Sequence, residues 1–374
     1  METADNVGNR HSSMRGGDEM NYKVPINKGN YDMDTPERVK KFDENRGAGW
    51  EDGYKEYRKN WSQYPETQYV PEYPLQVDIE LSSLCNLRCP MCYTITEEFR
   101  KKVSAGFMDI GLFTKIVDEI AGKVPAVRLS LRGEATLHPE FIHCIRHCKE
   151  KGIKEVSFLT NLSKFTKEFF IEVAEAGADW ITISIDGVGL QYDDIRKPLK
   201  FEDTLQRIKD IYEIKEANGW KKPVIKVQGI WPAIRKNPSE YYNCFVPYVD
   251  LVAFNPLIDY LDQDEDIVYE DEFVCPQPYQ RLVIGSDGRV LLCSNDEEGN
   301  YVLGDANKQS VYEIWHGELL DTVRRLHREG RFKEFAVCKK CYLPRATEES
   351  EHAFVNDREI VIKNYINRKQ VIGE

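Results

Sequence analysis

The chain has 374 residues, with 51 basic and 63 acidic side chains and a formal net charge of −12. Hydrophobic residues make up 41% of it, enough for the core of one large or two modest domains. No run of 18 apolar residues occurs in the sequence, so we expect no membrane partner. The polar first 20 residues lack the apolar stretch of a secretory signal, which predicts a cytoplasmic protein. The excess of acidic over basic side chains argues against a nucleic-acid partner, since binding to the phosphate backbone needs clustered cations.

The N-terminal part divides into two segments. Residues 1–33 show little apolar periodicity and are expected to be flexible. Asp34 stands three residues before Glu37, and this spacing predicts Asp34 as the N-cap of a helix over 37–46. Aromatic residues recur at helical spacing within 50–61, which predicts a helix that packs its aromatic face on the main domain; a lid over the substrate is the alternative. Residues 34–74 are therefore expected to form a helical extension.

From residue 75 onward, strand-like runs alternate with amphipathic helical patterns. The expected strands lie at about 76–81, 126–131, 154–159, 180–185, 223–229 and 250–254. The expected helices lie at about 111–122, 139–151, 166–177, 201–218 and 238–248. This alternation predicts an α/β fold with a parallel sheet and right-handed crossovers. Six units are too few for a closed barrel, so we expect a partial (β/α)6 TIM-like barrel over 75–260, with its chemistry at the carboxyl ends of the strands.

A different pattern begins after residue 260. An acidic loop at 261–272 precedes two apolar runs that flank the turn at 285–288, which predicts a hairpin. A helical pattern at 309–328 and a Cys-x-x-Cys pair follow. These elements predict a small α+β domain over 261–350. Residues 351–374 are expected to form a C-terminal tail, for which the sequence indicates no particular element.

The strongest chemical signal directly follows the first expected strand. Cys85, Cys89 and Cys92 form a CxxxCxxC motif. Three thiolates at this spacing can hold three corners of a [4Fe-4S] cube and leave the fourth iron open for a ligand. A structural zinc site that borrows a distant fourth ligand is the alternative.

With this motif the sequence resembles the radical S-adenosylmethionine (SAM) superfamily over about 76–345. The resemblance implies that SAM binds the open iron and is cleaved to a 5′-deoxyadenosyl radical, which removes a hydrogen atom from the substrate. Such enzymes need an external one-electron reductant such as flavodoxin or ferredoxin. A non-catalytic, metal-stabilised scaffold would not need both an open cluster and acids at the strand ends, so we expect an enzyme.

Further positions resemble the SAM-binding motifs of this family. Gly133 and Glu134 match part of its Gly-Gly-Glu-Pro motif, in which the acid contacts the SAM ammonium, whereas Arg132 and Ala135 depart from it. The position of Met91 is often aromatic in the family, and Tyr93 is a nearby substitute. The expected SAM contacts are Met91, Gly133, Glu134, Asn161, Ser184 and Arg196.

A second set of cysteines lies in the C-terminal part: Cys275, Cys293, Cys338 and Cys341. Four thiolates suit a fully ligated iron-sulfur cluster or a zinc ribbon, and the residues alone leave both open. The arrangement resembles the auxiliary-cluster domain called twitch, a shorter relative of the SPASM domain. That resemblance implies one auxiliary [4Fe-4S] cluster.

The reaction type depends on the remaining cysteines and on the substrate. Relatives with a single auxiliary cluster often act on small polar molecules, so we expect dehydrogenation of a sugar or aminocyclitol carbon, with the auxiliary cluster accepting an electron. Redox-neutral epimerisation and peptide modification are the alternatives. An epimerase would need a spare thiol, whereas Cys144, Cys148 and Cys244 are expected on outer helices as structural residues. The candidate substrate contacts are Tyr93, Arg132, Arg281 and Asp296.

Overall fold

The computed structural model describes residues 22–26, 28–257, 266–368 and 372. The predictions for residues 1–21 and for the first part of the acidic loop, 261–265, lie outside this range. Within it, none of the helices combines the length and apolar character that a membrane crossing requires.

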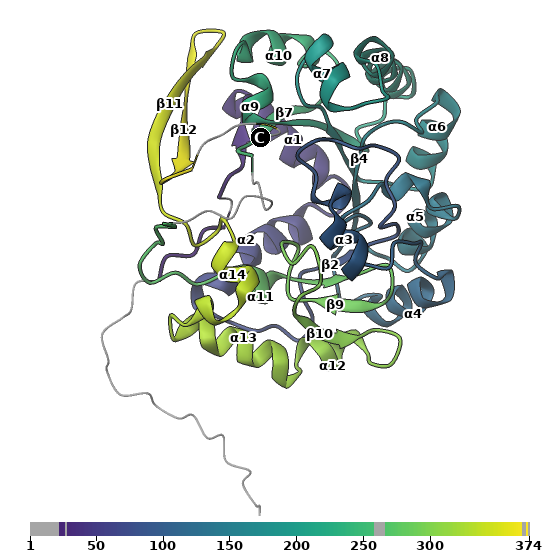
Figure 1. The fold of residues 1–374 in the computed structure, drawn as a ribbon. Helices are drawn as coiled ribbons and strands as arrows, with labels where there is room; N and C mark the ends of the chain where they lie inside the picture. Colours follow the sequence, from purple (N-terminus) through teal and green to yellow (C-terminus); the bar gives the residue numbers. More distant parts are fainter. Residues whose placement is uncertain (1–21, 27, 258–265, 369–371, 373–374) are drawn as a thin grey trace, which may run out of the picture.

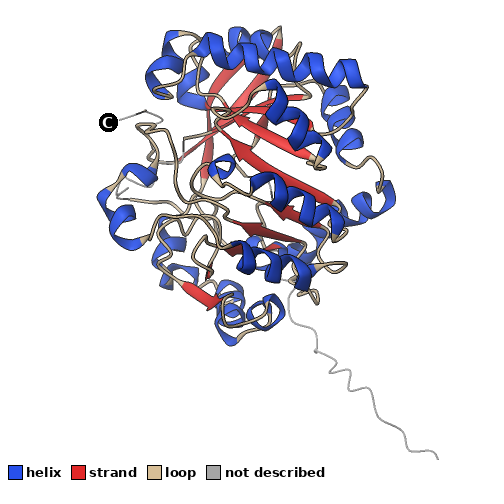
Figure 2. Ribbon diagram, turned by 90° about the vertical axis from the view of Figure 1, so that its right-hand side faces the viewer, coloured by secondary structure: helices blue, strands red, loops and turns tan. Residues whose placement is uncertain are grey.

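Six parallel strands form the centre of the fold, and they follow one another in the sheet in chain order. Their bounds are β2 (Gln76–Ile79), β3 (Ala126–Arg128), β4 (Glu155–Thr160), β5 (Trp180–Ser184), β6 (Val224–Ile230) and β7 (Leu251–Asn255). Figure 2 shows them as a curved sheet with helices along its outer side. Val77, Ile181 and Val227 are fully buried, as expected for parallel strands that are covered on both faces. The predicted partial (β/α)6 barrel is confirmed.

The helices between these strands include all five that the sequence predicts. They are α4 (Ile110–Ile120), α5 (Phe141–Glu150), α6 (Lys167–Glu175), α8 (Phe201–Asn218) and α10 (Pro238–Phe245). Three shorter helices were not predicted: α3 (Glu97–Lys102), α7 (Leu190–Ile195) and α9 (Trp231–Ile234). In Figure 1, α4, α5, α6 and α8 cover the outer side of the barrel.

The predicted N-cap of the first helix is wrong by one residue. Helix α1 (Pro36–Arg46) begins with Thr35 as its N-cap. Asp34 instead accepts hydrogen bonds from the Val252 backbone N–H (2.6 Å) and the Tyr242 hydroxyl (2.9 Å). The carboxylate therefore attaches the segment before α1 to the barrel. The expected flexibility of residues 1–33 is wrong for residues 31–33, because β1 (Tyr31–Asp32) pairs with β7 and Met33 is fully buried.

The predicted aromatic helix is α2 (Glu51–Thr67). Its side chains Tyr54, Tyr57 and Trp61 are buried in a small core with Leu75, so the predicted packing is confirmed. The helix continues beyond residue 61 because the aromatic pattern continues into its last turns.

The C-terminal hairpin joins the barrel sheet. As predicted, β8 (Arg281–Ile284) and β9 (Arg289–Leu291) pair antiparallel, and β10 (Val302–Asp305) pairs with β9. β8 also pairs with β2 in parallel, which the sequence did not predict. The auxiliary domain therefore extends the barrel sheet, whose order is β1-β7-β6-β5-β4-β3-β2-β8-β9-β10.

The single helix predicted at 309–328 is wrong. The segment forms α12 (Val311–Trp315) and α13 (Glu318–Arg328). Ser310 and Glu313 make a capping box at the start of α12, and the chain breaks at Gly317, which is the N-cap of α13. The cysteine-bearing segments include α11 (Gln277–Gln280) and α14 (Ala336–Lys340).

The described residues of the C-terminal tail contain strands that the sequence analysis did not predict. β11 (Thr347–Val355) and β12 (Arg358–Tyr365) form a hairpin, coloured yellow in Figure 1. Its two-residue turn is Asn356-Asp357, and both residues have positive φ, which is the requirement of a type I′ turn. Glu351 accepts a hydrogen bond of 2.7 Å from the Trp231 indole, so the hairpin is attached to the barrel.

Candidate functional site

The CxxxCxxC loop leaves the carboxyl end of β2. Cys89 is buried and Cys85 is exposed. Burial raises the pKa of the Cys89 thiol to about 11, although nearby Arg196 acts in the opposite direction. A bound metal would have to displace this proton, because the thiolate is the ligating form. The Asn161 amide donates a hydrogen bond of 2.9 Å to Asn86 within the loop, so the end of β4 orders the cysteine loop.

Gly133 lies where the loop after β3 meets the start of the cysteine loop. A Cβ atom there would lie 2.3 Å from the Leu84 carbonyl oxygen and 2.5 Å from that of Ser82. The backbone N–H of Glu134 donates to the same Leu84 carbonyl at 2.8 Å. Glycine is therefore required by the contact between two backbones, which fixes the position of Glu134 relative to the cysteines.

The Glu134 carboxylate is buried and accepts several hydrogen bonds. Its donors include the Thr136 hydroxyl (2.6 Å), the Thr160 hydroxyl (2.8 Å) and the Asn161 backbone N–H (2.7 Å). Burial raises the pKa of Glu134, and these hydrogen bonds oppose the rise. The ammonium group of a ligand would form an ion pair with the buried Glu134 carboxylate and so stabilise its charged form.

Arg196 is held at the end of the barrel by Asp186. Its Nε and Nη2 atoms lie 2.7 and 2.5 Å from Asp186 Oδ2. Burial by itself lowers the pKa of Arg196, but Asp186 and Cys89 raise it, with a net upward shift. The guanidinium is therefore charged and lies on the side of the cysteine loop. Ser184 makes no side-chain hydrogen bond with any described residue, and Met91 packs partly buried against the core.

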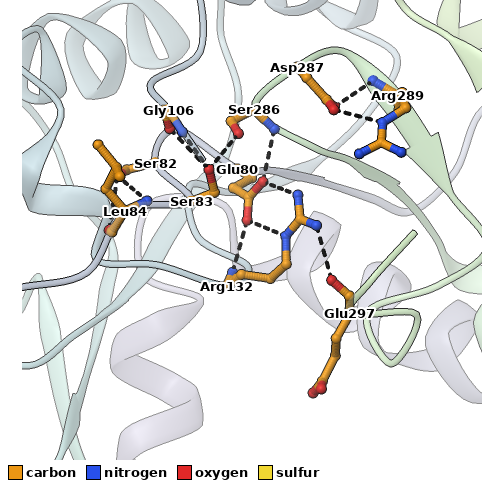
Figure 3. A network of polar contacts seen from close by, with 10 residues as sticks. All are labelled: Glu80, Ser82, Ser83, Leu84, Gly106, Arg132, Ser286, Asp287, Arg289 and Glu297. Atoms are coloured by element: carbon orange, nitrogen blue, oxygen red, sulfur yellow. Dashed lines mark hydrogen bonds and ion pairs between the residues drawn. The ribbon is translucent and has the colours of Figure 1, made fainter. Parts of the chain in front are cut away.

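Arg132, a candidate substrate contact, forms a buried ion pair. Its Nε and Nη2 atoms donate to the two carboxylate oxygens of Glu80 at 2.6 and 2.5 Å. Its Nη1 donates to the Glu297 carbonyl at 3.0 Å, and Glu80 also accepts from the Ser286 N–H. Figure 3 shows this network between the end of β2 and the auxiliary hairpin. The departure from the family motif at Arg132 thus joins the two domains.

Two other candidate substrate contacts have structural positions. The Asp296 carboxylate accepts from the backbone N–H groups of Asn300 (2.8 Å) and Tyr301 (2.9 Å), so it holds its own loop. The Tyr93 ring packs edge-on against Phe99 at 5.7 Å between ring centres, and burial raises the Tyr93 pKa well above its usual value.

The four C-terminal cysteines lie together. Burial raises the pKa of the Cys338 thiol, and the charges of Cys293, Cys275 and Cys341 raise it further. The Asn295 amide donates to Cys341 Sγ at 3.3 Å. Four buried thiols whose charges act on one another have the chemistry of ligands for an anionic metal cluster, although the described residues do not hold three or more of them in a ready-made metal-binding group.

His327 also belongs to this cysteine set and was missed by the sequence reasoning. Its Nε2 lies 3.7 Å from Cys338 Sγ, and burial lowers its pKa to about 4, so its ring is neutral. No spacing signal marks it, because it lies on α13, eleven residues before Cys338.

A cavity of about 600 Å³ occupies the interior of the barrel. Its walls come from the strands, from α1 and α2, and from the auxiliary domain, and we call it the barrel cavity. Of the four candidate substrate contacts, only Arg281 lines it. Other polar residues that line it are Arg128, Thr182, Lys226 and Gln228. The sequence reasoning missed these four, although polar residues at alternate positions of buried parallel strands are a signal for an interior site.

Comparisons with known proteins agree with this geometry. The family model "Radical SAM superfamily" matches residues 79–225, and the model "Iron-sulfur cluster-binding domain", called SPASM, matches residues 275–342. The chain belongs to the radical SAM superfamily. The matched segments contain all seven clustered cysteines. This radical SAM enzyme therefore uses SAM and a [4Fe-4S] cluster, and its SPASM domain carries auxiliary iron-sulfur ligation.

Two curated relatives match most of this radical SAM protein. The tungsten-containing aldehyde ferredoxin oxidoreductase cofactor-modifying protein of Pyrococcus furiosus is 28% identical over 67% of this chain and 71% of its own length. The SAM-dependent 2-deoxy-scyllo-inosamine dehydrogenase of Niallia circulans is 21% identical over 75% of this chain and 97% of its own length.

Solved structures share the fold at low sequence identity. BtrN in complex with AdoMet and 2-DOIA gives a TM-score of 0.51 at 16% identity, covering 72% of this chain and 92% of its own. Native anSMEcpe with bound AdoMet gives the same TM-score and identity, with 72% and 86% covered. These similarities support the partial barrel.

Proposed function

We propose that this enzyme dehydrogenates an alcohol or amine carbon of a small, sugar-like substrate, with the auxiliary cluster as the electron acceptor. The position of the barrel cavity carries the proposal. Three residues that line it, Pro276, Ser294 and Tyr342, each directly follow an auxiliary cysteine in the chain. A substrate in this cavity would lie between the barrel strands and the auxiliary cysteines. Its volume of about 600 Å³ is within the usual range for small-molecule sites.

The ligand assignments follow the two cysteine sets. We assign Cys85, Cys89 and Cys92 to the SAM-binding [4Fe-4S] cluster, and Cys275, Cys293, Cys338 and Cys341 to one auxiliary [4Fe-4S] cluster. When bound, these groups and SAM would supply reductive SAM cleavage, hydrogen-atom abstraction and an electron acceptor. Electrons would come from a flavodoxin or ferredoxin.

The SAM contacts follow from the side chains around the first cysteine set. Glu134 would pair with the SAM ammonium, and Arg196, oriented by Asp186, would contact its carboxylate. We also assign Met91, Gly133, Asn161 and Ser184 to the SAM site; none of these residues lines the barrel cavity.

The positions of the spare thiols argue against epimerisation. Cys144 and Cys148 are fully buried on α5, and Cys244 lies on α10, partly exposed. None of these three cysteines is among the residues that line the barrel cavity. A thiol that donates a hydrogen atom to the substrate would have to reach this cavity.

The test uses anaerobically reconstituted enzyme with candidate aminocyclitols and sugars in deuterated solvent. Dehydrogenation predicts 5′-deoxyadenosine together with a product lighter by two hydrogens. Replacing Cys144, Cys148 or Cys244 with Ala should leave product formation intact. A product of unchanged composition that carries one solvent deuterium would contradict the proposal and support an epimerase, and modification of a peptide alone would support a maturase.

A further inference from the structure

The barrel cavity has an excess of positive charge, in contrast to the acidic chain as a whole. It is lined by six basic side chains and two acidic ones. The basic residues are Lys28, Arg46, Arg58, Arg128, Lys226 and Arg281, and the acidic residues are Asp32 and Asp43. Buried charges are costly unless they are paired. A cation that has no anionic partner in the protein is therefore a candidate to bind an anionic ligand.

Two of the cations are already compensated. Arg46 donates to both carboxylate oxygens of Glu155 at 2.6 and 2.8 Å. Lys28 lies 3.5 Å from Glu270 and donates to the Leu343 carbonyl at 3.1 Å. These two residues have structural partners and leave no charge for a ligand.

Arg281 is only partly compensated. Its Nη1 lies 3.3 Å from Asp78, and its side chain stacks over Trp61 at 4.8 Å. Its Nε is buried and has no hydrogen-bond partner among the described residues. The indole N–H of Trp180, which also lines the cavity, is likewise buried without a partner there. Both groups are donors, whereas the buried Asn255 amide oxygen in the same lining is an acceptor that also has no partner among the described residues.

Among the cavity cations on the strands, Arg128 on β3 and Lys226 on β6 are the least compensated. Neither makes an ion pair or a side-chain hydrogen bond with any residue that the structure describes. They also repel one another, since Arg128 disfavours the charged form of Lys226, and Arg281 disfavours that of Arg128. Asp32 favours the charged form of Lys226, and Asp78 and Tyr57 favour that of Arg128. Such an arrangement is costly unless something else supplies negative charge.

We propose that Arg128, Lys226 and Arg281 bind an oxyanion of the substrate, so that this enzyme acts on a phosphorylated or carboxylated sugar derivative. The inference rests on the proposed function, because the cavity is the substrate site only if the radical chemistry takes place there. A neutral polar ligand could satisfy the unpaired donors, but only an anion offsets the charges of Arg128 and Lys226, which have no ion-pair partner among the described residues. The aromatic rings of Trp61 and Trp180 would pack against the uncharged part of the substrate.

The test measures binding to the anaerobically prepared holoprotein by calorimetry and by thermal shift. The probes are inorganic phosphate, glucose 6-phosphate, glucuronate and neutral glucose, each with the wild-type protein. Comparison of the phosphate probes with glucuronate distinguishes a phosphate ligand from a carboxylate. The variants Arg128→Met and Lys226→Met remove one cation each, and Arg235→Met and Lys59→Met are the matched controls, because both of these residues are exposed and do not line the cavity.

We expect at least one anionic probe to bind the wild type more tightly than glucose does. Each cavity variant should weaken its binding by about tenfold or more, as for loss of a charge-assisted hydrogen bond, and the control variants should bind like the wild type. Equal binding of glucose and of every anion, or equal loss in cavity and control variants, would overturn the proposal. Iron content and melting temperature, measured on each variant, separate loss of binding from loss of folding.

Failure of the oxyanion proposal can be distinguished from failure of the proposed function. Reductive cleavage of SAM by the wild type with dithionite tests the radical chemistry without any substrate. Absence of cleavage in a fully iron-loaded preparation would contradict the proposed function. Intact cleavage with no preference for anions would contradict the oxyanion site alone.

Discussion

At the scale of single residues, Lys226 is a buried cation without a partner, and its effect on stability can be predicted. Burial lowers its pKa to about 8, opposed by Asp32 and assisted by Arg128 and Arg46. Below pH 8 the folded protein holds this charge at a cost of at most about 3 kcal/mol. We therefore expect Lys226→Met to raise the melting temperature at pH 7.

The pH dependence of this effect has a definite sign. Between about pH 8 and the higher pKa of an exposed lysine, Lys226 is largely deprotonated in the folded state but protonated in the unfolded state. The folded wild-type protein therefore binds fewer protons, and its free energy of unfolding rises with pH relative to that of Lys226→Met. The gap between the two melting temperatures should narrow from pH 7 to pH 10. The matched control is Lys215→Met, which breaks a 2.6 Å ion pair with Asp250 and should lower the melting temperature at pH 7. If both variants melted at a lower temperature than the wild type at pH 7, Lys226 would have a structural partner.

At the scale of elements, the pairing of β2 with β8 joins the barrel to the auxiliary domain, and the Glu80–Arg132 ion pair connects the loops that follow. Both side chains are fully buried. Removal of one partner from such a pair typically costs about 3–5 kcal/mol, whereas removal of both costs much less. Arg132→Met should therefore destabilise the protein, and the double variant Glu80→Met, Arg132→Met should recover part of the loss in thermal melts. If Arg132 contacted the substrate instead, the single variant would raise KM and leave the melting temperature unchanged.

At the scale of the whole molecule, the two cysteine sets predict two clusters with separate tasks. Anaerobically prepared protein should contain about eight irons, from two [4Fe-4S] cubes. Replacing Cys85, Cys89 and Cys92 together with Ala should remove about half of the iron and all SAM cleavage. Replacing Cys275 and Cys293 with Ala should abolish product but leave SAM cleavage without substrate oxidation. Zinc in place of half of the iron would contradict the auxiliary-cluster assignment.

The sequence by itself determined the features that depend on local patterns. Alternating apolar runs and helical periodicity identified the six strands and the main helices, because burial on both faces of a parallel sheet requires them. The CxxxCxxC spacing and Glu134 identified the family, since each of these two motifs lies within one loop. The β11–β12 hairpin could have been found from its Asn-Asp turn, but its charged strands concealed it.

The tertiary structure decided what depends on contacts between distant segments. The pairing of Arg132 with Glu80, the addition of β8 to the barrel and the position of His327 beside Cys338 join residues whose separation in the chain carries no signal. The same holds for the barrel cavity. Arg128, Lys226 and Arg281 lie on three different strands, and only the curvature of the sheet directs them into one space. A local pattern shows which residues are polar, but the charge of a site is the sum over all the elements that enclose it.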